Sequence, residues 1–322
     1  MLLKKLTEAF APSGREDSVR DIIKNEVKDF ADEVYTDVLG NLVAHKKGNG
    51  KKIMLAAHTD EIGIAVNYID KNGFIRFSAV GGVYTKRLLN RRVVFANGTV
   101  GVIDTEADNK DNKIEKLYID IGAKDKEDCE KKVSVGDMAV FCGEFVEQGD
   151  VVISKALDNR AGCFALIEAI KKVKGDNDLY FCFTTQEEVG LRGAMACAYN
   201  VMPEYAIAVD VTDTGDVPEG LQMAVELGCG AAVKVMDQSV ITHPEVRTTL
   251  IELAKRKNIP YQLEVLTAGG TDAGVIHTTG AGVKTGGISI PTRYIHSPAE
   301  MIAKSDLDAV CDLVCAFCEN EF

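Results

Sequence analysis

The stretch FCFTTQEEVGLRGA, residues 181–194, joins an apolar, β-branched run to two adjacent acids and a glycine. The apolar run is typical of a buried strand, and the residues after the glycine predict a helix over 190–199. Glu187 and Glu188 therefore stand where the chain leaves a sheet. Two neighbouring carboxylates repel each other, so their placement at the end of a buried strand indicates a nearby cation.

Strands and helices alternate along the chain on both sides of this stretch. The segment 13–30 carries apolar residues at helical spacing and begins with a predicted capping box of Ser13 and Glu16. Strands are expected in 41–48 and 51–63. Beyond residue 153 the predicted order is helix 160–174, strand 178–186, helix 190–199, strands 205–211 and 231–236, helix 244–257, strand 261–266, a short helix near 272–279, strand 286–290 and helix 304–319. This alternation predicts an α/β fold with a mixed sheet sandwiched by helices.

The segment 64–152 has a different pattern. It contains short β-type runs separated by turn signals, including the hairpin signal Asn97-Gly98, and only one short helix is expected, around 125–132. We therefore predict a small β-rich domain, 64–152, inserted into a discontinuous α/β domain of 1–63 and 153–322.

Composition narrows the class of protein. The 322 residues include 37 Lys and Arg against 49 Asp and Glu, a net charge of −12. A nucleic-acid or anionic-membrane binder usually has a basic footprint, so neither partner is expected. The first residues lack a signal peptide's long apolar region, and there is no run of about 18 apolar residues. Nine cysteines, mostly inside apolar runs, indicate reduced thiols, and we expect a cytoplasmic protein.

Potential metal ligands follow several of the predicted strands. In open α/β sheets, ligands gather beyond the carboxyl ends of strands, so these side chains can converge on one crevice. Two imidazoles with several carboxylates suit Zn²⁺, Co²⁺ or Mn²⁺. The candidates are His58, Asp60, Asp158, Glu187, Glu188, Asp210 and His296.

Two of these positions suggest specific roles. Asp60 lies two residues after His58 and can hold the second nitrogen of that imidazole. Glu187 and Glu188 can face opposite sides of an extended segment, because successive side chains alternate. One of them can then bind the metal while the other takes a proton from metal-bound water.

Each feature also has a purely structural interpretation. His58 or His296 alone could be a structural histidine, and Asp158 could cap a helix. Asp210 could be a turn residue, and the glutamate pair could be a solvated helix start. All of these structural readings holding together is improbable. Arg192 and Arg293 could favour acidic substrates, form structural ion pairs, or bind a ligand carboxylate.

The motifs AAHTDEIG, KALDNRAG, TTQEEVGLRGA, AVDVT and GGTDAG…ISIPTRYIHSP resemble those of metallopeptidase family M42. These are the tetrahedral aminopeptidases, including glutamyl aminopeptidases and members labelled endoglucanase M. The resemblance covers nearly the whole chain, and it implies a zinc-peptidase-like fold whose inserted domain makes dimer contacts. The dimers of the family assemble into a hollow dodecamer.

The resemblance implies two divalent metal ions per subunit. One would be bound by His58, Asp158 and Asp210, the other by Asp158, Glu188 and His296, with Glu187 as general base and Asp60 beside His58. The implied reaction removes N-terminal residues from short peptides with a free α-amine, by attack of metal-activated water. Alternatives are a deacylase or carboxypeptidase-type amidohydrolase on the same site, and a non-catalytic assembly protein. A glycosidase is disfavoured, because its two carboxylates would have to flank a sugar.

Overall fold

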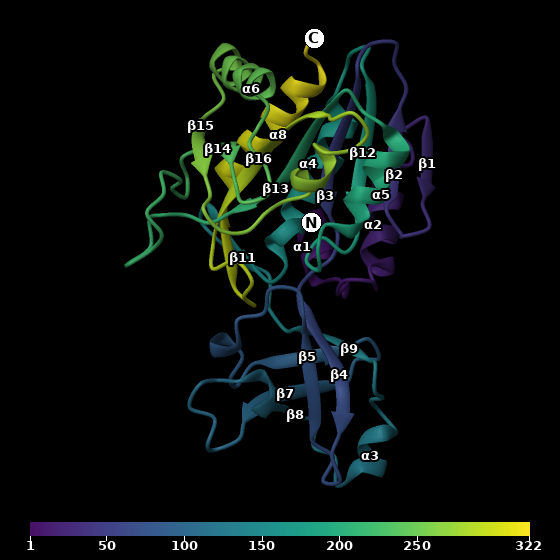
Figure 1. The fold of residues 1–322 in the computed structure, drawn as a ribbon, viewed down its shortest axis with the longest axis vertical. Coiled ribbons are helices and arrows are strands. Elements are labelled where there is room, and N and C mark those ends of the chain that lie inside the picture. The colour runs from purple at the N-terminus through teal and green to yellow at the C-terminus, as the bar shows by residue number, and fades with distance from the viewer.

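The computed structural model describes residues 1–322 and contains two bodies, a large mixed sheet with helices on both faces and a small closed barrel (Figure 1). The large sheet runs β1-β2-β12-β3-β13-β16-β17-β11-β10, and β14 and β15 extend it beside β16. The barrel closes in the order β4-β5-β8-β7-β6-β9. The predicted fold class, a helix-covered mixed sheet with a small β-rich domain, is confirmed.

The strands of the large sheet are β1 Glu33–Thr36, β2 Leu42–Lys46, β3 Lys52–His58, β10 Val146–Gln148, β11 Val151–Ser154, β12 Asp178–Thr184, β13 Tyr205–Thr212, β14 Ala231–Met236, β15 Tyr261–Val265, β16 Lys284–Arg293 and β17 Glu300–Ala303. Those of the barrel are β4 Gly63–Ile69, β5 Ile75–Val80, β6 Arg92–Phe95, β7 Val100–Thr105, β8 Leu117–Asp120 and β9 Met138–Phe141. The helices are α1 Leu2–Glu8, α2 Asp17–Val27, α3 Lys126–Glu130, α4 Leu157–Lys172, α5 Arg192–Val201, α6 Pro244–Lys257, α7 Ala273–Ile276 and α8 Lys304–Cys318, with 3₁₀ turns η1 Thr85–Arg87 and η2 Ile114–Lys116.

Side chains of the central strands alternate between the two faces of the sheet. Ile53 and Leu55 of β3 point into the main core, which also takes in buried residues of α1, α2, α4, α6 and α8. Met54 and Ala56 of the same strand point into a second core with α5 and α7. A strand buried on both faces must be apolar throughout, which is why β3, β12 and β13 appear in the sequence as continuous apolar runs.

The barrel has its own core of buried residues, among them Ile64, Phe77 and Phe141. Its strands span Gly63 to Phe141, and the chain then returns to the large sheet, where β10 pairs β11 and β11 pairs β17. The division of the chain into 1–63 with 153–322 and 64–152 stays a prediction. By strand pairing, however, β10 and the start of β11 belong to the large sheet.

Several local predictions were wrong. Helix α2 begins at Asp17 with Glu16 at its N-cap and no side-chain cap, so Ser13 and Glu16 do not form the predicted capping box. Their side chains instead make contacts at the candidate site, described below. The short strands β1 and β17 were not predicted, because four residues are too few for a periodic signal.

No helix of the structure is both long and apolar enough to cross a bilayer.

Candidate metal centre and active site

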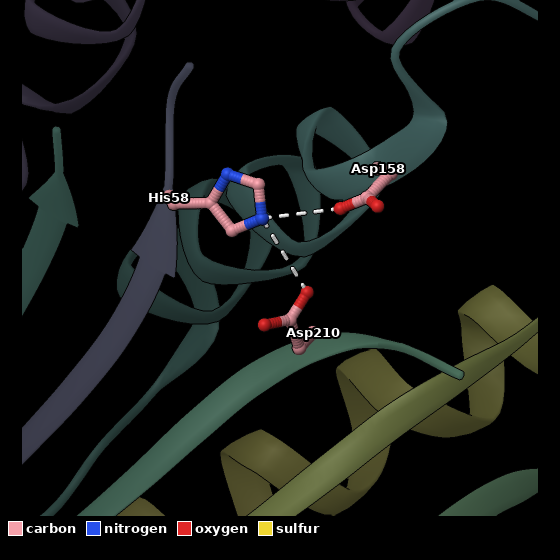
Figure 2. A group of neighbouring side chains, drawn as sticks. All are labelled: His58, Asp158 and Asp210. Carbon is pink, nitrogen blue, oxygen red and sulfur yellow. Dashed lines mark ion pairs between the residues drawn. The ribbon is translucent and has the colours of Figure 1, made fainter. Parts of the chain in front are cut away.

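Three neighbouring parallel strands deliver the centre of the candidate site. His58 is the last residue of β3 and lies opposite Thr184, the last residue of β12. Asp210 lies on β13, which pairs with β3 on its other side. Asp158 enters from the start of α4 and points at the same imidazole (Figure 2). The carboxyl ends of these strands therefore meet at one edge of the sheet, as expected for an α/β site.

The predicted ligands form two groups that share one carboxylate. In the first half-site, His58 Nε2 lies 3.1 Å from Asp158 Oδ1 and 3.6 Å from Asp210 Oδ1. In the second half-site, His296 Nε2 lies 3.3 Å from Asp158 Oδ2 and 3.1 Å from Glu188 Oε1. Within each half-site the potential ligand atoms all lie within 4.8 Å of one another. Asp158 thus offers one oxygen to each half-site.

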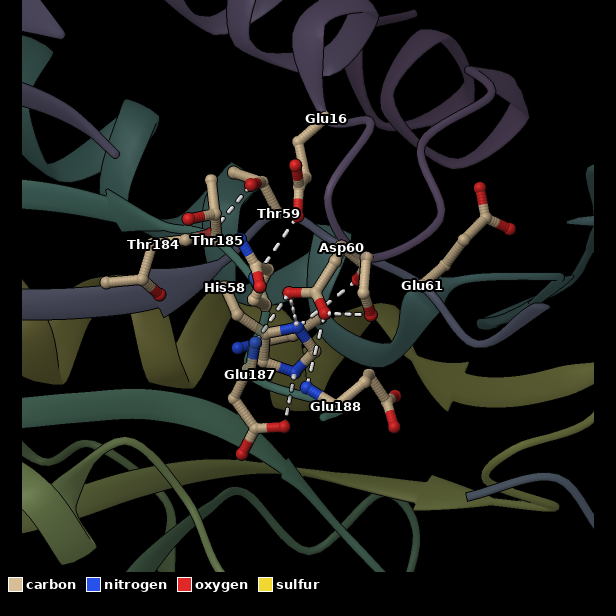
Figure 3. A network of polar contacts seen from close by, with 12 residues as sticks. Glu16, His58, Thr59, Asp60, Glu61, Thr184, Thr185, Glu187 and Glu188 are labelled. Atoms are coloured by element: carbon tan, nitrogen blue, oxygen red, sulfur yellow. Dashed lines mark hydrogen bonds and ion pairs between the residues drawn. The ribbon is translucent and has the colours of Figure 1, made fainter. Parts of the chain in front are cut away.

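Glu187 and Glu188 face different parts of the site, but they stand at the start of a turn, where the Gly190 N–H donates to the Glu187 carbonyl at 2.9 Å, and not in the extended segment that was predicted. Glu188 faces the second half-site, whereas Glu187 Oε2 lies 4.0 Å from His58 Nε2 (Figure 3). Glu187 also lines the cavity described below, and it belongs to neither group of potential ligands. It therefore stands beside the potential metal ligands with its carboxylate free to contact a substrate.

Asp60 holds His58 and the backbone of both glutamates in place. Its Oδ1 accepts a hydrogen bond from the Glu187 backbone N–H at 3.0 Å and lies 3.4 Å from His58 Nδ1. Its Oδ2 accepts from the Glu188 N–H at 3.2 Å and from Ser13 Oγ at 2.6 Å. One fully buried carboxylate thus fixes the imidazole and the backbone of both glutamates.

Three supporting residues escaped the sequence reasoning. Ser13 binds Asp60, and Glu16 Oε1 accepts from the Gln186 N–H at 3.1 Å, next to Glu187. Buried Glu300 joins the shared carboxylate to the second half-site. Its Oε2 accepts from the Asp158 N–H at 2.9 Å, and its Oε1 accepts from the His296 N–H at 2.9 Å. The only sequence signal was Ser13 and Glu16 as a capping pair, which predicted a local role.

The electrostatics of the cluster fit divalent cations. Burial lowers the pKa of His58, but Glu187, Asp158 and Asp210 outweigh this effect and raise it. Likewise, burial opposes the charge of His296, but its hydrogen bonds to carboxylates raise its pKa to about 12. Burial raises the pKa of both Asp210 and Glu187 well above the ordinary range. Without ions, the acids therefore hold protons on the histidines, and a bound dication would replace those protons with a charge that the donor set suits.

A cavity of about 780 Å³ opens over both half-sites. Its wall includes Leu191 and Leu266 from the large domain and Tyr84 from the barrel, so it is large enough to take the end of a peptide. Arg293 also lines it, but its guanidinium donates to Asp216 from Nε at 3.1 Å and from Nη2 at 2.5 Å. The structure therefore favours the ion-pair interpretation of Arg293.

Several other polar and sulfur-bearing residues belong to neither half-site. Arg192 is exposed, and its side chain donates only to Gln186 Oε1, from Nη1 at 3.4 Å. Asp272 is completely buried and accepts from Thr184 Oγ1 at 2.6 Å, and it makes no side-chain cap on α7. The nine cysteines are all free thiols.

Comparison with known proteins identifies the family. Residues 40–313 match the family model described as M42 glutamyl aminopeptidase. A relative from Acetivibrio thermocellus, which carries a provisional name as an aminopeptidase, is 56% identical over 322 residues and covers 98% of each chain. The lysyl aminopeptidase of Pyrococcus furiosus is 36% identical over 336 residues, covering 99% of this chain and 96% of its own.

A solved structure agrees with this match. The TET1 peptidase of Pyrococcus horikoshii, described as assembling into a tetrahedron or a large octahedral shell, has a TM-score of 0.89 and 34% identity, over 99% of this chain and 98% of its own. The chain belongs to the M42 family of aminopeptidases, which are hydrolases, and the predicted resemblance is confirmed.

Proposed function

We propose that this protein is a metal-dependent aminopeptidase that uses two divalent ions per subunit and Glu187 as its general base. The observation that carries the proposal is the position of Asp158, whose two carboxylate oxygens lie 3.1 Å from His58 and 3.3 Å from His296. A carboxylate shared by two His-carboxylate groups is the arrangement that a pair of metal ions requires. An ordinary helix cap has no need of two imidazoles beside it.

The two ions would be held by the two half-sites. The first would use His58, Asp158 and Asp210, and the second would use Asp158, Glu188 and His296. The ligands suit Zn²⁺, Co²⁺ or Mn²⁺. Bound ions supply Lewis acidity that polarises the scissile carbonyl and favours ionisation of the attacking water.

Glu187 has the properties of a general base. Its carboxylate faces the cavity 4.0 Å from His58 Nε2, and its backbone N–H is held by Asp60. In the metal-free site burial raises its pKa, and bound dications would lower that pKa again and keep the carboxylate ionised, as a proton acceptor must be. In the proposed reaction its Oε2 takes a proton from the attacking water and then donates that proton to the leaving amine nitrogen.

Asp60 acts through its neighbours and not on the substrate. It accepts hydrogen bonds from the backbone N–H groups of Glu187 and Glu188 and faces His58 Nδ1. It therefore fixes the position of the general base relative to both half-sites. This arrangement leaves Nε2 of His58 directed at Asp158 and Asp210, where a metal ion would need it.

The proposed substrates are short peptides with a free N-terminal amine. The family model is described as a glutamyl aminopeptidase, whereas one relative is named a lysyl aminopeptidase. The preferred N-terminal side chain therefore varies within the family. We also propose self-association to dimers and a dodecamer, as the fit to the tetrahedral relative supports. Twelve chains of 34.8 kDa would have a mass of about 418 kDa (12 × 34.8) by light scattering.

The proposal is tested with a panel of aminoacyl-p-nitroanilides that covers acidic, basic and apolar residues. The protein is assayed after chelation and again after addition of Zn²⁺, Co²⁺ or Mn²⁺, with N-acetylated versions of each substrate as controls. Hydrolysis that needs both a metal and a free amine is expected. Cleavage of the N-acetylated substrates instead would favour the deacylase alternative, and metal-independent turnover would contradict the proposed site.

A further inference from the structure

A loop of the barrel touches the metal centre of the large domain. We name residues 81–87 the barrel loop; it leaves β5 and ends in the 3₁₀ turn η1. Gly82, Tyr84 and Arg87 of this loop line the active-site cavity together with the candidate ligands. The small domain therefore contributes part of the active-site wall, although none of its residues belongs to either half-site.

The two glycines of the barrel loop pack directly on ligands of the second half-site. A Cβ atom added at Gly82 would lie 2.6 Å from both Nδ1 and Cε1 of His296. One added at Gly81 would lie 3.0 Å from Glu188 Oε2 and 3.1 Å from Glu188 Cβ. These separations are shorter than van der Waals contact, so only glycine lets the backbone approach the two ligands this closely.

The two candidate histidine ligands are held in different ways. His58 Nδ1 faces Asp60, with Oδ1 at 3.4 Å and the backbone oxygen at 3.2 Å, so a group of its own domain orients its ring. The Nδ1 edge of His296 faces Gly82, and no protein group hydrogen-bonds that nitrogen. Metal-binding histidines usually have such a partner. Packing against the barrel loop therefore replaces the missing hydrogen bond of His296.

The barrel loop also hydrogen-bonds to the backbone next to His296. Arg87 Nη1 donates to the Ile295 carbonyl at 3.1 Å, and its guanidinium lies 4.8 Å from the centre of the Tyr84 ring. Tyr294 and His296 have φ angles of 62° and 58°, which are unfavourable for residues with a side chain. Such a conformation persists only where contacts hold it, and Arg87 supplies one at the residue between them.

We propose that the barrel loop positions His296 and thereby sets the affinity of the second half-site for its metal ion, while the first half-site does not depend on it. This inference rests on the proposed two-ion site. Gly82 acts by leaving space beside the imidazole, and Arg87 acts by fixing the Ile295 carbonyl. Both are positioning residues, because neither contacts the ions or the reacting atoms.

The experiment measures Co²⁺ binding to the full-length protein. Wild type, Gly82→Ala, Arg87→Ala and Arg87→Lys are stripped by chelation and titrated calorimetrically, and the bound metal is counted by mass spectrometry after desalting. Two controls sit in the same barrel away from the site. Arg92→Ala removes an exposed arginine of β6. Gly98→Ala introduces a strained side chain at a turn glycine with φ of 84°, but no atom lies within 4 Å of the added Cβ, so it shows the effect of destabilising the barrel without touching the site.

Wild type and both controls should bind two ions per chain. Gly82→Ala and Arg87→Ala should keep one ion with unchanged affinity and bind the second about 10- to 100-fold more weakly. Arg87→Lys should recover part of the loss, because an ammonium can still donate to the Ile295 carbonyl. If Gly82→Ala does not fold by circular dichroism, the two Arg87 variants decide the matter.

Two results separate failure of the inference from failure of the proposed function. Unchanged affinity for both ions in the Gly82 and Arg87 variants, with wild type binding two, would overturn the role of the barrel loop alone. Equal weakening of both ions would overturn it as well, since the contacts are confined to the second half-site. Fewer than two ions in wild type would instead overturn the two-ion proposal.

Discussion

Replacing Asp60 by asparagine should weaken both stability and catalysis, because one buried carboxylate accepts several hydrogen bonds at once. Its Oδ1 faces the Glu187 N–H and His58 Nδ1, and its Oδ2 faces the Glu188 N–H and Ser13 Oγ. An amide has only one oxygen, so its Nδ2 must meet one of these pairs. The Oδ2 side is the better choice, since the Ser13 hydroxyl can turn and accept.

The expected loss of stability follows from the one hydrogen bond that no side-chain rotation can restore. With Nδ2 on the Oδ2 side, the Glu188 N–H would face another donor, which costs about 1–3 kcal/mol. For 322 residues the entropy of unfolding is about 0.7 kcal/mol/K, so the melting temperature should fall by about 1.5–4.5 °C. The mismatch at the Glu188 N–H should shift the turn that carries both Glu187 and Glu188, and so lower kcat/KM by about 10- to 100-fold.

The assay combines differential scanning calorimetry with steady-state hydrolysis of an aminoacyl-p-nitroanilide, at one protein concentration and with saturating Co²⁺. Asp21→Asn, an exposed substitution on α2, is the matched control and should change neither quantity. Unaltered kcat/KM in Asp60→Asn would refute the reasoning, because it would mean that the position of Glu187 does not depend on this carboxylate.

Three further predictions concern other parts of the molecule. Glu61→Gln leaves the buried Lys155 ammonium, now 2.6 Å from Glu61, without its anion; the cost of about 3–5 kcal/mol should lower the melting temperature by about 4–7 °C in calorimetry. Asp216 has its pKa lowered to about 2 from 3.8, chiefly by hydrogen bonding to Arg293, so this pair stabilises the fold above pH 3.8 and the contribution is lost as the pH falls toward 2. Urea titrations from pH 5 to 2 should show a shallower acid loss in Asp216→Asn, and an unchanged slope would contradict that assignment. Asp158→Ala removes an oxygen from each half-site and should lose both ions by mass spectrometry; retention of two would contradict its bridging position.

The sequence predicts the framework of the fold well, because apolar runs and turn residues act locally. The strand ending at His58 and the strand preceding Glu187 are both continuous apolar segments, as burial on both faces requires. The fold class and the family are confirmed by the structure and the comparisons. The roles of the individual site residues stay predictions, although the structure brings all the predicted ligands into two adjoining groups.

What the sequence could not predict depends on contacts between distant residues. Glu300 binds the Asp158 backbone across 142 positions, and no local pattern marks it. Ser13 had a local signal, but its hydroxyl binds Asp60, 47 residues away, in place of capping α2. The approach of Gly82 to His296 joins the barrel to the large domain, and it becomes visible only when both are assembled.

The measurement that tests the central claim most directly is the metal content and turnover of Glu187→Gln. The substitution preserves the shape of the side chain and lies outside both three-residue groups, so the variant should bind two Co²⁺ ions as wild type does. Without a base, its kcat on an aminoacyl-p-nitroanilide should fall by about 10²- to 10⁴-fold. Two bound ions together with wild-type kcat would contradict the mechanism proposed for this aminopeptidase.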